Sequence, residues 1–443
     1  MSDPNVVVAR NTDKAPVSDL YSQTVAFSHY NNLSAQLPID PATGAIVAGG
    51  AAEQAEQCFK NLQAIVESIG HDMNDIIRVS IFLADIMDLN AVEKVQASFF
   101  PTYQPARTVV AVDALPQGAL VFIEALVDNG EGTQSVPQAG DLVKLTNNTH
   151  AAPYDAGSTQ TVAFSHYNNI TMQLPLDPGT GRPILGDVAA QTAQCLRNVK
   201  AILTSVDVPF DDIVKVTIFV KNLADASVVD EVYKTFFPDS GIARAVNYLP
   251  ARTVVPVKDL PYHCDVAVEA VVSHGDGTPP QAIEDRHGLI IEACNTDAAP
   301  KCPYATQSVA FSHYNNISAQ LGVDAASGKL VAGGVAEQAE QACKNIKAII
   351  ENVGHVMEDA VKVNVYLKNI DDLAAVEDVC ARYFTGTPAF RAVGTAALPM
   401  DALVQVEALI TNGEGTIPNE PQAGDLVKYV NNTHNAPYDA LST

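Results

Sequence analysis

The sequence predicts an α+β protein built from three tandem domains that close on one another. A chain of 443 residues is too long for one ordinary core and suits about three domains. The stretch "TVAFSHYNN" at residues 24–32 returns at 161–169, and "SVAFSHYNN" follows at 308–316. These copies lie roughly 140 residues apart, which is the size of a domain and exceeds the period of a solenoid repeat. The sequence therefore predicts three tandem repeats of one domain.

The first half of each repeat predicts strands followed by a helix. After "TVAFSHYNN" comes an apolar strand ending in Gln, then a turn-rich stretch such as "PATGAIVAGG". Between residues 52 and 69 the apolar residues recur at the spacing of one helix face, at Ala55, Cys58, Leu62, Ile65, Val66 and Ile69. We expect an amphipathic helix there.

The second half predicts strand, helix and two strands. "DIIRVSIFLAD" (75–85) alternates and is β-branched, so it is expected to form a half-buried strand. "DLNAVEKVQASFFP" (88–101) predicts a second helix that ends at its proline. "ARTVVAVDAL" (106–115) and "ALVFIEALV" (119–127) are two further strands, expected to pair antiparallel. This order places both helices on one face of a mixed sheet.

The other face of each sheet needs a partner, because two helices cover only one side. A closed ring of the three repeats buries all such faces, so we expect an intramolecular pseudo-trimer and a monomeric chain. The predicted boundaries are 5–136, 141–278 and 287–417. The segment 421–443 repeats 137–159 closely and is expected to be the start of a fourth repeat or a tail.

Composition excludes several classes of partner. A net charge of −25 repels phosphate backbones, so nucleic acid is not an expected partner. No apolar run is long enough to span a bilayer, and the first residues carry no targeting pattern. The seven cysteines form no regular framework and are expected to be reduced. These features predict a cytoplasmic protein without a membrane partner.

Several motifs, in order, resemble the Rid (YjgF) family. They are "TGAIVAGG", the helix "EQCFKNLQAIVESIG", "VDEVYKTFFP", "PARTVVAVDALP" and "IEALV". The likeness covers nearly all of each repeat. It implies a chorismate-mutase-like fold that assembles as a trimer with ligand clefts between adjacent subunits. Three repeats in one chain would then be a trimer joined covalently.

The resemblance implies cofactor-free hydrolysis of small enamine and imine acids, such as 2-aminoacrylate, to 2-keto acids and ammonia. Arg107 and Arg252 match the arginine that clamps the substrate carboxylate, a role that suits the bidentate guanidinium. The alternative is an arginine paired internally with Glu124 or Glu269 on the next strand. The third repeat carries Phe390 instead, and the adjacent Arg391 is expected on the opposite sheet face.

Other family positions carry over as substrate-binding candidates. Tyr21 matches the family tyrosine in the first repeat only. The strand hydroxyl and amide positions match in all three repeats, at Ser34, Gln36, Thr171, Gln173, Ser318 and Gln320.

The acid that activates water in deaminating members has no match. Phe122, Ala267 and Gln405 stand at its position, and Glu124 and Glu269 follow two residues later as the candidate catalytic acids. Two functions remain open: a deaminase-like hydrolase with low or altered activity, and a non-catalytic carboxylate-binding or structural protein.

One histidine recurs in each "SHYNN" motif, at His29, His166 and His313. These residues could ring a threefold axis as metal ligands, but one histidine beside a turn is more often hydrogen-bonded in the turn. We therefore expect no metal site and no other cofactor.

Overall fold

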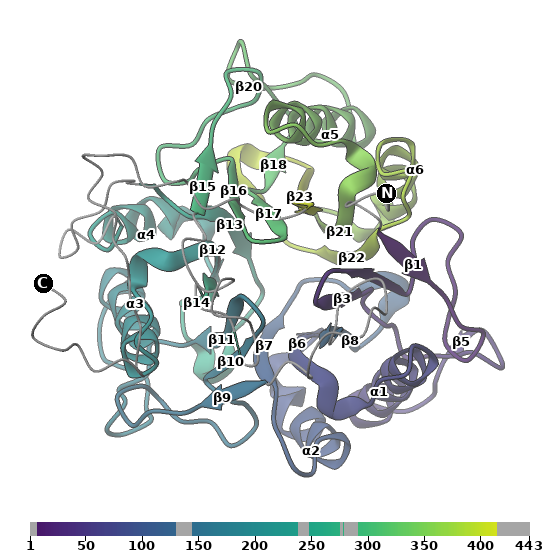
Figure 1. The fold of residues 1–443 in the computed structure, drawn as a ribbon, viewed down its shortest axis with the longest axis vertical. Helices are drawn as coiled ribbons and strands as arrows, with labels where there is room; N and C mark the ends of the chain where they lie inside the picture. Colours follow the sequence, from purple (N-terminus) through teal and green to yellow (C-terminus); the bar gives the residue numbers. More distant parts are fainter. Residues whose placement is uncertain (1–6, 130–143, 238–247, 275–277, 279–290, 414–443) are drawn as a thin grey trace, which may run out of the picture.

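Three similar α+β units form a closed ring in the computed structural model (Figure 1). The structure describes residues 7–129, 144–237, 248–274, 278 and 291–413. The predicted fourth-repeat or tail segment, 421–443, lies outside the described residues. Each repeat contributes one six- or seven-stranded sheet, and the three sheets stand around a common axis.

The first repeat contains one main sheet, one short hairpin and two helices. Its sheet has the order β1-β2-β3-β8-β6-β7, formed by Val8–Arg10, Thr24–Phe27, Tyr30–Leu33, Val121–Asp128, Ile76–Leu83 and Ala106–Ala111. Its helices are α1 (Ala51–Ser68) and α2 (Leu89–Phe99), and its hairpin is β4 (Ile39–Asp40) with β5 (Ala45–Ile46). Only β6 and β7 run parallel in the main sheet, which makes it mixed.

The other two repeats follow the same plan. The second sheet, in the order β13-β12-β14-β11-β10-β9, is formed by Ala251–Pro256, Ile213–Val220, Val266–Ser273, Tyr167–Gln173, Thr161–Phe164 and Leu145–Asn147, with helices α3 (Val188–Ser205) and α4 (Ala226–Tyr233). The third, in the order β15-β16-β17-β23-β21-β22, is formed by Ile291–Cys294, Ser308–Phe311, Tyr314–Ile317, Val404–Thr411, Ala360–Leu367 and Ala389–Gly394, with helices α5 (Val335–Asn352) and α6 (Leu373–Tyr383). The short strand β18 (Gln320–Leu321) also pairs with β23, and β19 (Val323–Asp324) and β20 (Lys329–Leu330) form a separate hairpin.

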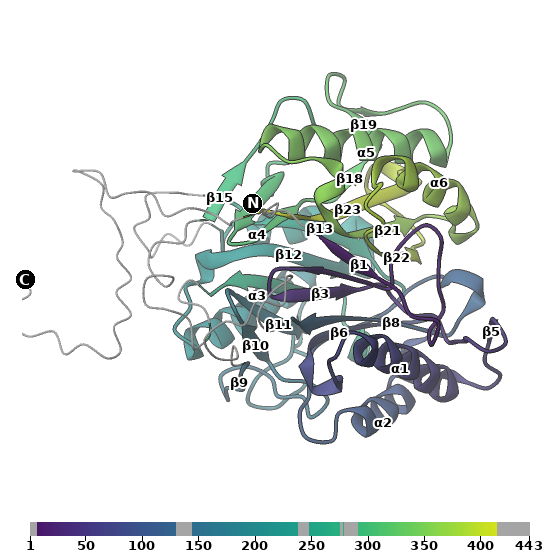
Figure 2. The ribbon, with the colours of Figure 1, turned by 45° about the vertical axis from the view of Figure 1, so that its right-hand side comes forward.

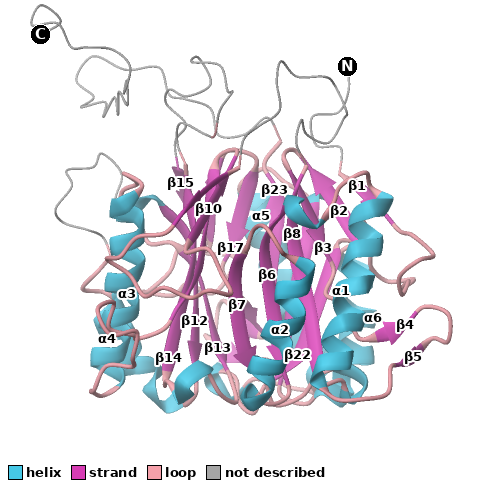
Figure 3. Ribbon diagram, turned by 90° about the horizontal axis from the view of Figure 1, so that it is seen from below, coloured by secondary structure: helices cyan, strands magenta, loops and turns pink. Residues whose placement is uncertain are grey.

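The predicted placement of the helices is confirmed: they lie on the outside and the strands on the inside (Figure 3). Each helix pair packs on the outer face of its own sheet and encloses a separate core. In the first repeat this core contains the predicted helix stripe, including Cys58, Leu62 and Ile65, together with Val109 and Ala111 of β7. Figure 2 shows α5 and α6 covering the third sheet and α1 and α2 covering the first.

The expected antiparallel pairing of the last two strands is wrong. In the first repeat β6 lies between β7 and β8, pairing parallel with β7 and antiparallel with β8. The end of β7 and the segment after it form bridges to the other repeats. Ala111 bridges to Asp259, and Ala114 bridges to Gly394.

The inner faces of the three sheets pack against one another, as expected for a pseudo-trimer. Two apolar clusters on the axis draw residues from every repeat. One contains Phe82, Phe219 and Tyr366, and the other contains Phe27, Phe164, Phe311, Tyr30, Tyr167 and Tyr314. The ring therefore supplies the cover that each sheet lacks alone.

Three tyrosine hydroxyls link the repeats in a circle. Tyr30 donates to the carbonyl of Phe164, Tyr167 to that of Phe311, and Tyr314 to that of Phe27. The last bond joins the third repeat back to the first, and all three tyrosines are buried. Within the described ranges, no helix has the length and apolar character needed to cross a membrane.

Removing the hydroxyl that closes the circle should destabilise the ring. Tyr314→Phe leaves the buried Phe27 carbonyl without its donor, which should lower the free energy of unfolding by about 1–3 kcal/mol. Tyr103→Phe is the matched control, because the buried Tyr103 hydroxyl has no hydrogen-bond partner among the described residues. Urea unfolding of both variants tests this. An equal decrease in the free energy of unfolding in the two variants would contradict it.

Candidate functional site

The arginine positions of the three repeats lie where one repeat meets the next. We define three junctions by these residues. The first joins Arg107 to Thr171, the second joins Arg252 to Ser318, and the third joins Phe390 to Ser34. In each, the backbone N–H of the first residue donates to the hydroxyl of the second, at 2.9, 2.8 and 2.7 Å respectively.

The predicted hydroxyl and amide residues hold the junctions together. Ser34, Thr171 and Ser318 each donate their hydroxyl to a backbone carbonyl while accepting the bond from the neighbouring repeat. The amides of Gln36, Gln173 and Gln320 donate to the carbonyls of these same residues at 2.8–3.0 Å. All six side chains are buried. The structure thus brings all six to the junctions, and their role in substrate binding stays a prediction.

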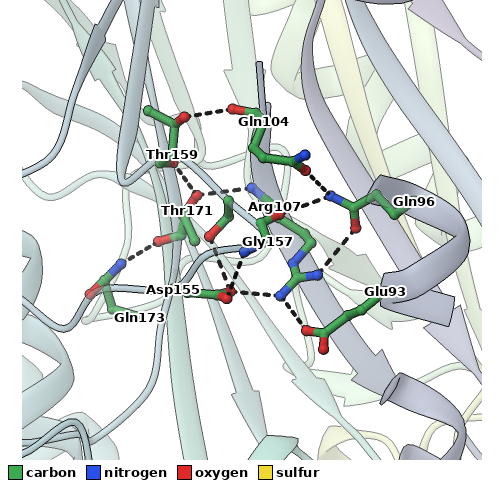
Figure 4. Close-up of polar contacts among 10 residues, drawn as sticks. Glu93, Gln96, Gln104, Arg107, Asp155, Gly157, Thr159, Thr171 and Gln173 are labelled. Carbon is green, nitrogen blue, oxygen red and sulfur yellow. Dashed lines mark hydrogen bonds and ion pairs between the residues drawn. The ribbon is translucent and has the colours of Figure 1, made fainter. Parts of the chain in front are cut away.

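At the first junction, two carboxylates from different repeats bind the Arg107 guanidinium (Figure 4). Nη2 of Arg107 lies 2.7 Å from Glu93 Oε1, on α2 of the same repeat, and 2.6 Å from Asp155 Oδ2 of the next repeat. Nη1 donates to Gln96 Oε1 at 3.1 Å. Arg107 is therefore paired internally, but with Glu93 and Asp155 and not with Glu124. Two acids against one arginine leave a net negative charge there.

Gly157 makes room for this arrangement. A Cβ atom at position 157 would lie 2.7 Å from Nη1 of Arg107, closer than side chains tolerate. The Gly157 carbonyl also accepts from the Gln96 amide at 2.8 Å. The second repeat is thus shaped to receive the arginine of the first.

The second junction leaves part of its arginine unbound. Nη2 of Arg252 pairs with Asp230 of α4, and the guanidinium lies 4.9 Å from the ring centre of Tyr233 and 5.7 Å from that of Tyr304. Nε and Nη1 of Arg252 have no hydrogen-bond partner in the part of the chain that the structure describes. The side chain is only 5% exposed. Buried donors of this kind favour an anionic ligand.

Tyr304 belongs to the third repeat and reaches this arginine although its sequence position is shifted from that of Tyr21. Its hydroxyl contacts Glu231 Oε1 at 3.4 Å. The equivalent stretch of the second repeat carries Tyr154, which is exposed. Among the described residues, only the second junction therefore combines an arginine with an aromatic ring from the neighbouring repeat.

The third junction is filled by aromatic rings. Phe390 stacks on Tyr21 with ring centres 5.1 Å apart and an interplanar angle of 18°. The cavity beside them has a volume of about 10 Å³, which is space for one water molecule at most. Glu377 borders it, and burial, together with the nearby Asp378, raises the pKa of that carboxyl. The structure brings Tyr21 to this junction, where it packs on the residue that replaces the arginine.

The candidate catalytic acids lie on the other side of the sheets. Glu124 and Glu269 line a cavity on the axis, paired with Lys362 and Arg78 at 2.9 and 3.2 Å. Burial alone would raise the pKa of Glu124, but the charges of Arg391 and Lys362 outweigh it and lower the pKa to about 2. Arg391 lines the same cavity, so the expectation that it points away from Phe390 agrees with the structure.

The positions of the missing acid are buried. Phe122 and Ala267 belong to the apolar cluster on the axis, and Gln405 is also buried. Strand alternation explains this, since Phe122 and Glu124 share the inner face of β8. None of the three side chains can donate or accept a proton as a carboxyl group does.

Sequence reasoning missed the acids on the second helix of each repeat, two of which bind the junction arginines. Glu93, Asp230 and Glu377 each follow a buried valine in the second helix of their repeat, in "AVEKVQ", "VVDEVY" and "AVEDVC". An acid at the same position of every repeat was the available signal. Asp155, which reaches in from the next repeat, had no such signal.

The three histidines of the "SHYNN" motifs meet at one end of the axis. Their ring centres lie 5.7, 6.2 and 6.5 Å apart. Burial, reinforced by the other two histidines, lowers the pKa of His166 to about 3. His313 also lies 3.0 Å from the Gly413 carbonyl, a contact consistent with a hydrogen-bonded turn residue.

Comparison with known proteins identifies the family to which the three repeats belong. The pattern of the family described as Endoribonuclease L-PSP matches residues 12–128, 152–274 and 295–411. The chain belongs to this family. It contains three copies of the family's domain, and the resemblance to Rid (YjgF) proteins is confirmed.

Relatives of single-domain size match one repeat at a time. A RutC family protein, y4sK of Sinorhizobium fredii, is 45% identical over 107 residues, covering 24% of this chain and 85% of the relative. Human 2-iminobutanoate/2-iminopropanoate deaminase is 37% identical over 121 residues, covering 27% and 88%. Among solved structures, RidA from an Antarctic Psychrobacter species is 36% identical with a TM-score of 0.27, covering 27% of this chain and 98% of its own.

A small 2-keto acid should bind through Arg252 and not through Arg107. Arg252→Ala removes the free donors of the second junction, so the affinity for pyruvate should fall by about 1.5–3 kcal/mol. Arg107→Ala should leave it unchanged, because that guanidinium is already bound by acids. Titration calorimetry measures both. An equal loss in the two variants, or none in either, would contradict the assignment.

Removing the acids of the first junction should create a second binding site. Glu93→Gln with Asp155→Asn frees Arg107, and pyruvate should then bind there at least about tenfold more tightly than before, since a like charge about 4 Å away costs on the order of 1–4 kcal/mol. Glu56→Gln with Asp297→Asn is the control, because it removes two exposed charges elsewhere. If the affinity for pyruvate rises equally in both double variants, the net charge of the chain and not Arg107 controls it.

Proposed function

We propose that this chain hydrolyses small 2-imino and 2-enamino acids slowly, at the second junction. The observation that carries the proposal is the Arg252 guanidinium, which is buried between two repeats and keeps Nε and Nη1 free of protein partners in the described structure. Family membership supports the reaction class, since several relatives bear the name 2-iminobutanoate/2-iminopropanoate deaminase.

The proposed role of Arg252 is to bind the substrate carboxylate and orient the adjacent imine. An enamino acid first gains a proton at its terminal carbon and loses one from nitrogen, which gives the imine. Water then adds to the imine carbon, its two protons pass to the nitrogen, and the C–N bond breaks to release ammonia, so that an imino acid and water give a 2-keto acid and ammonia. Holding the two reactants in place lowers the barrier even without a proton-transferring group. Tyr233 and Tyr304 flank the guanidinium and restrict the plane in which a carboxylate can approach.

The other two junctions support no comparable site. A substrate carboxylate at the first junction would have to displace Glu93 or Asp155 from Arg107. The third junction has Phe390 in place of the arginine and leaves space for one water molecule at most. We therefore propose one working site per chain.

A low rate is expected because no acid stands at the position used for proton transfer in deaminating relatives. A positioned acid or base contributes about 10²–10⁴-fold. Glu124 and Glu269 are held in buried ion pairs, so the proposal gives them no part in proton transfer. The same observation favours a second candidate function, a binding protein that holds small carboxylates at Arg252 without converting them.

The family description names an endoribonuclease, and this activity is not part of the proposal. A chain with a net charge of −25 repels an RNA backbone, and phosphate contacts supply most of the affinity of such complexes.

Release of ammonia and 2-keto acid from freshly generated 2-aminoacrylate tests the proposal. The chain should exceed the spontaneous rate, Arg252→Ala should abolish the excess, and Glu269→Gln should retain it, because position 269 lies in the axial cavity and not at the second junction. The Gln oxygen can still accept from Arg78, and its amide can donate to the Thr108 hydroxyl. If the chain binds pyruvate but does not exceed the spontaneous rate, the second candidate function, a carboxylate-binding protein, is favoured. A rate lost in Glu269→Gln but kept in Arg252→Ala would overturn the proposed site.

A further inference from the structure

A polar cavity lies on the axis of the ring, between the inner faces of the three sheets. Its volume is about 110 Å³, which is space for several water molecules or for a small ion with its waters. Equivalent residues of the three repeats line it, namely Arg78, Lys215 and Lys362, and Glu124, Glu269 and Glu407. It is separate from the junctions, because these side chains lie on the inner sheet faces.

The equivalent charges form a closed circle of ion pairs. Each cation binds the glutamate of another repeat: Arg78 to Glu269 at 3.2 Å, Lys215 to Glu407 at 2.7 Å, and Lys362 to Glu124 at 2.9 Å. Three cations therefore balance three carboxylates. Buried ion pairs of this kind are tolerated because each charge is neutralised by its partner.

Arg391 breaks this balance. The first two repeats carry Thr108 and Thr253 at its position, where the hydroxyls contact Glu269 and Lys215. Arg391 instead brings a fourth cation, and its Nη1 lies 3.6 Å from Glu124, which is already bound by Lys362. Among the charged side chains that line the cavity, four cations thus face three carboxylates, an excess of one positive charge.

The tyrosine hydroxyls that line the cavity supply no negative charge to balance this excess. Tyr30, Tyr167, Tyr314 and Tyr366 also line it, and burial raises the pKa of each hydroxyl, so all four stay uncharged. Arg391 donates through Nη2 to the Tyr366 hydroxyl at 2.7 Å and lies over the Phe82 ring at 4.5 Å. A buried charge without a counter-charge is strongly unfavourable.

Three unused hydrogen-bond donors belong to residues that line the same cavity. Nε of Arg391 and the Nδ2 atoms of Asn32 and Asn169 are buried and have no hydrogen-bond partner among the described residues. Arg391 is 6% exposed, so bulk water does not satisfy it. The excess positive charge and the free donors call for the same kind of ligand, one that is small and carries a single negative charge.

We propose that the axial cavity holds one small monovalent anion of the halide or formate class beside Arg391. The anion balances the fourth cation and accepts from the free donors, and it thereby stabilises the closed ring. Because unfolding opens the cavity, stability depends on the anion concentration even where the folded ring exchanges the ion slowly. This site is independent of the proposed catalysis, since Arg391 lines the axial cavity and Arg252, at the second junction, does not.

Bromide is the probe, because its anomalous scattering identifies it in a crystal. Crystals of protein refolded in sodium bromide should show one anomalous peak in the cavity beside Arg391. Thermal unfolding in sodium bromide, with sodium gluconate keeping the ionic strength constant, should give a melting temperature that rises by about 1–4 °C and saturates. An absent peak together with a flat response would overturn the proposal.

Arg391→Thr is the matched variant, because threonine occupies this position in the other two repeats. It should lose both the peak and the bromide response. Arg382→Thr, a change at an exposed arginine, should keep both. If Arg391→Thr fails to fold, Asn364→Asp adds a fourth carboxylate to the cavity wall and should also abolish the bromide response. A response that persists in either cavity variant would show that bromide acts elsewhere.

Discussion

The packing of three inner sheet faces around one axis is the constraint on which the rest of the molecule depends. Helices cover only the outer face of each sheet, so the inner faces must cover one another. Strand alternation then divides the side chains of each strand between the helix side of the sheet and the axis of the ring. In β7, Val109 and Ala111 enter the helix-side core, whereas Thr108 and Val110 face the axis. A shift of one position moves a side chain from one environment to the other.

The junctions follow from the same packing. An arginine buried between two repeats needs a carboxylate, and the second helix supplies Glu93 to Arg107 and Asp230 to Arg252. In the third repeat the acid remains at Glu377 while the arginine has become Phe390. Burial and the nearby Asp378 raise the pKa of Glu377, as expected for a carboxyl that has lost its cation. The stacked pair of Tyr21 and Phe390 fills the space that the guanidinium would need.

The sequence was sufficient for the fold, because the repeat, the helix stripes and the uncovered sheet face all pointed to a ring of three. It was not sufficient for strand order: the segment after β7 looked like a hairpin turn, but its hydrogen bonds go to other repeats at Asp259 and Gly394. The sequence predicted which positions lie at the junctions, but it did not predict which side chains contact one another there. Asp155 reaches Arg107 from another repeat, and no local pattern reports a contact made across a junction.

Covalent linkage explains why such an unequal ring is possible. In a trimer of identical chains, every substitution on the axis occurs three times. An arginine at position 391 would then bury three extra guanidiniums in one cavity, a charge that the three carboxylates could not offset. In a single chain the change is made once, and the cavity must accommodate only one unmatched charge. The same holds for Phe390, which closes one junction and leaves Arg107 and Arg252 in place. Joining the repeats thus allowed each junction, and the axis itself, to change separately while the packing that all of them share was kept.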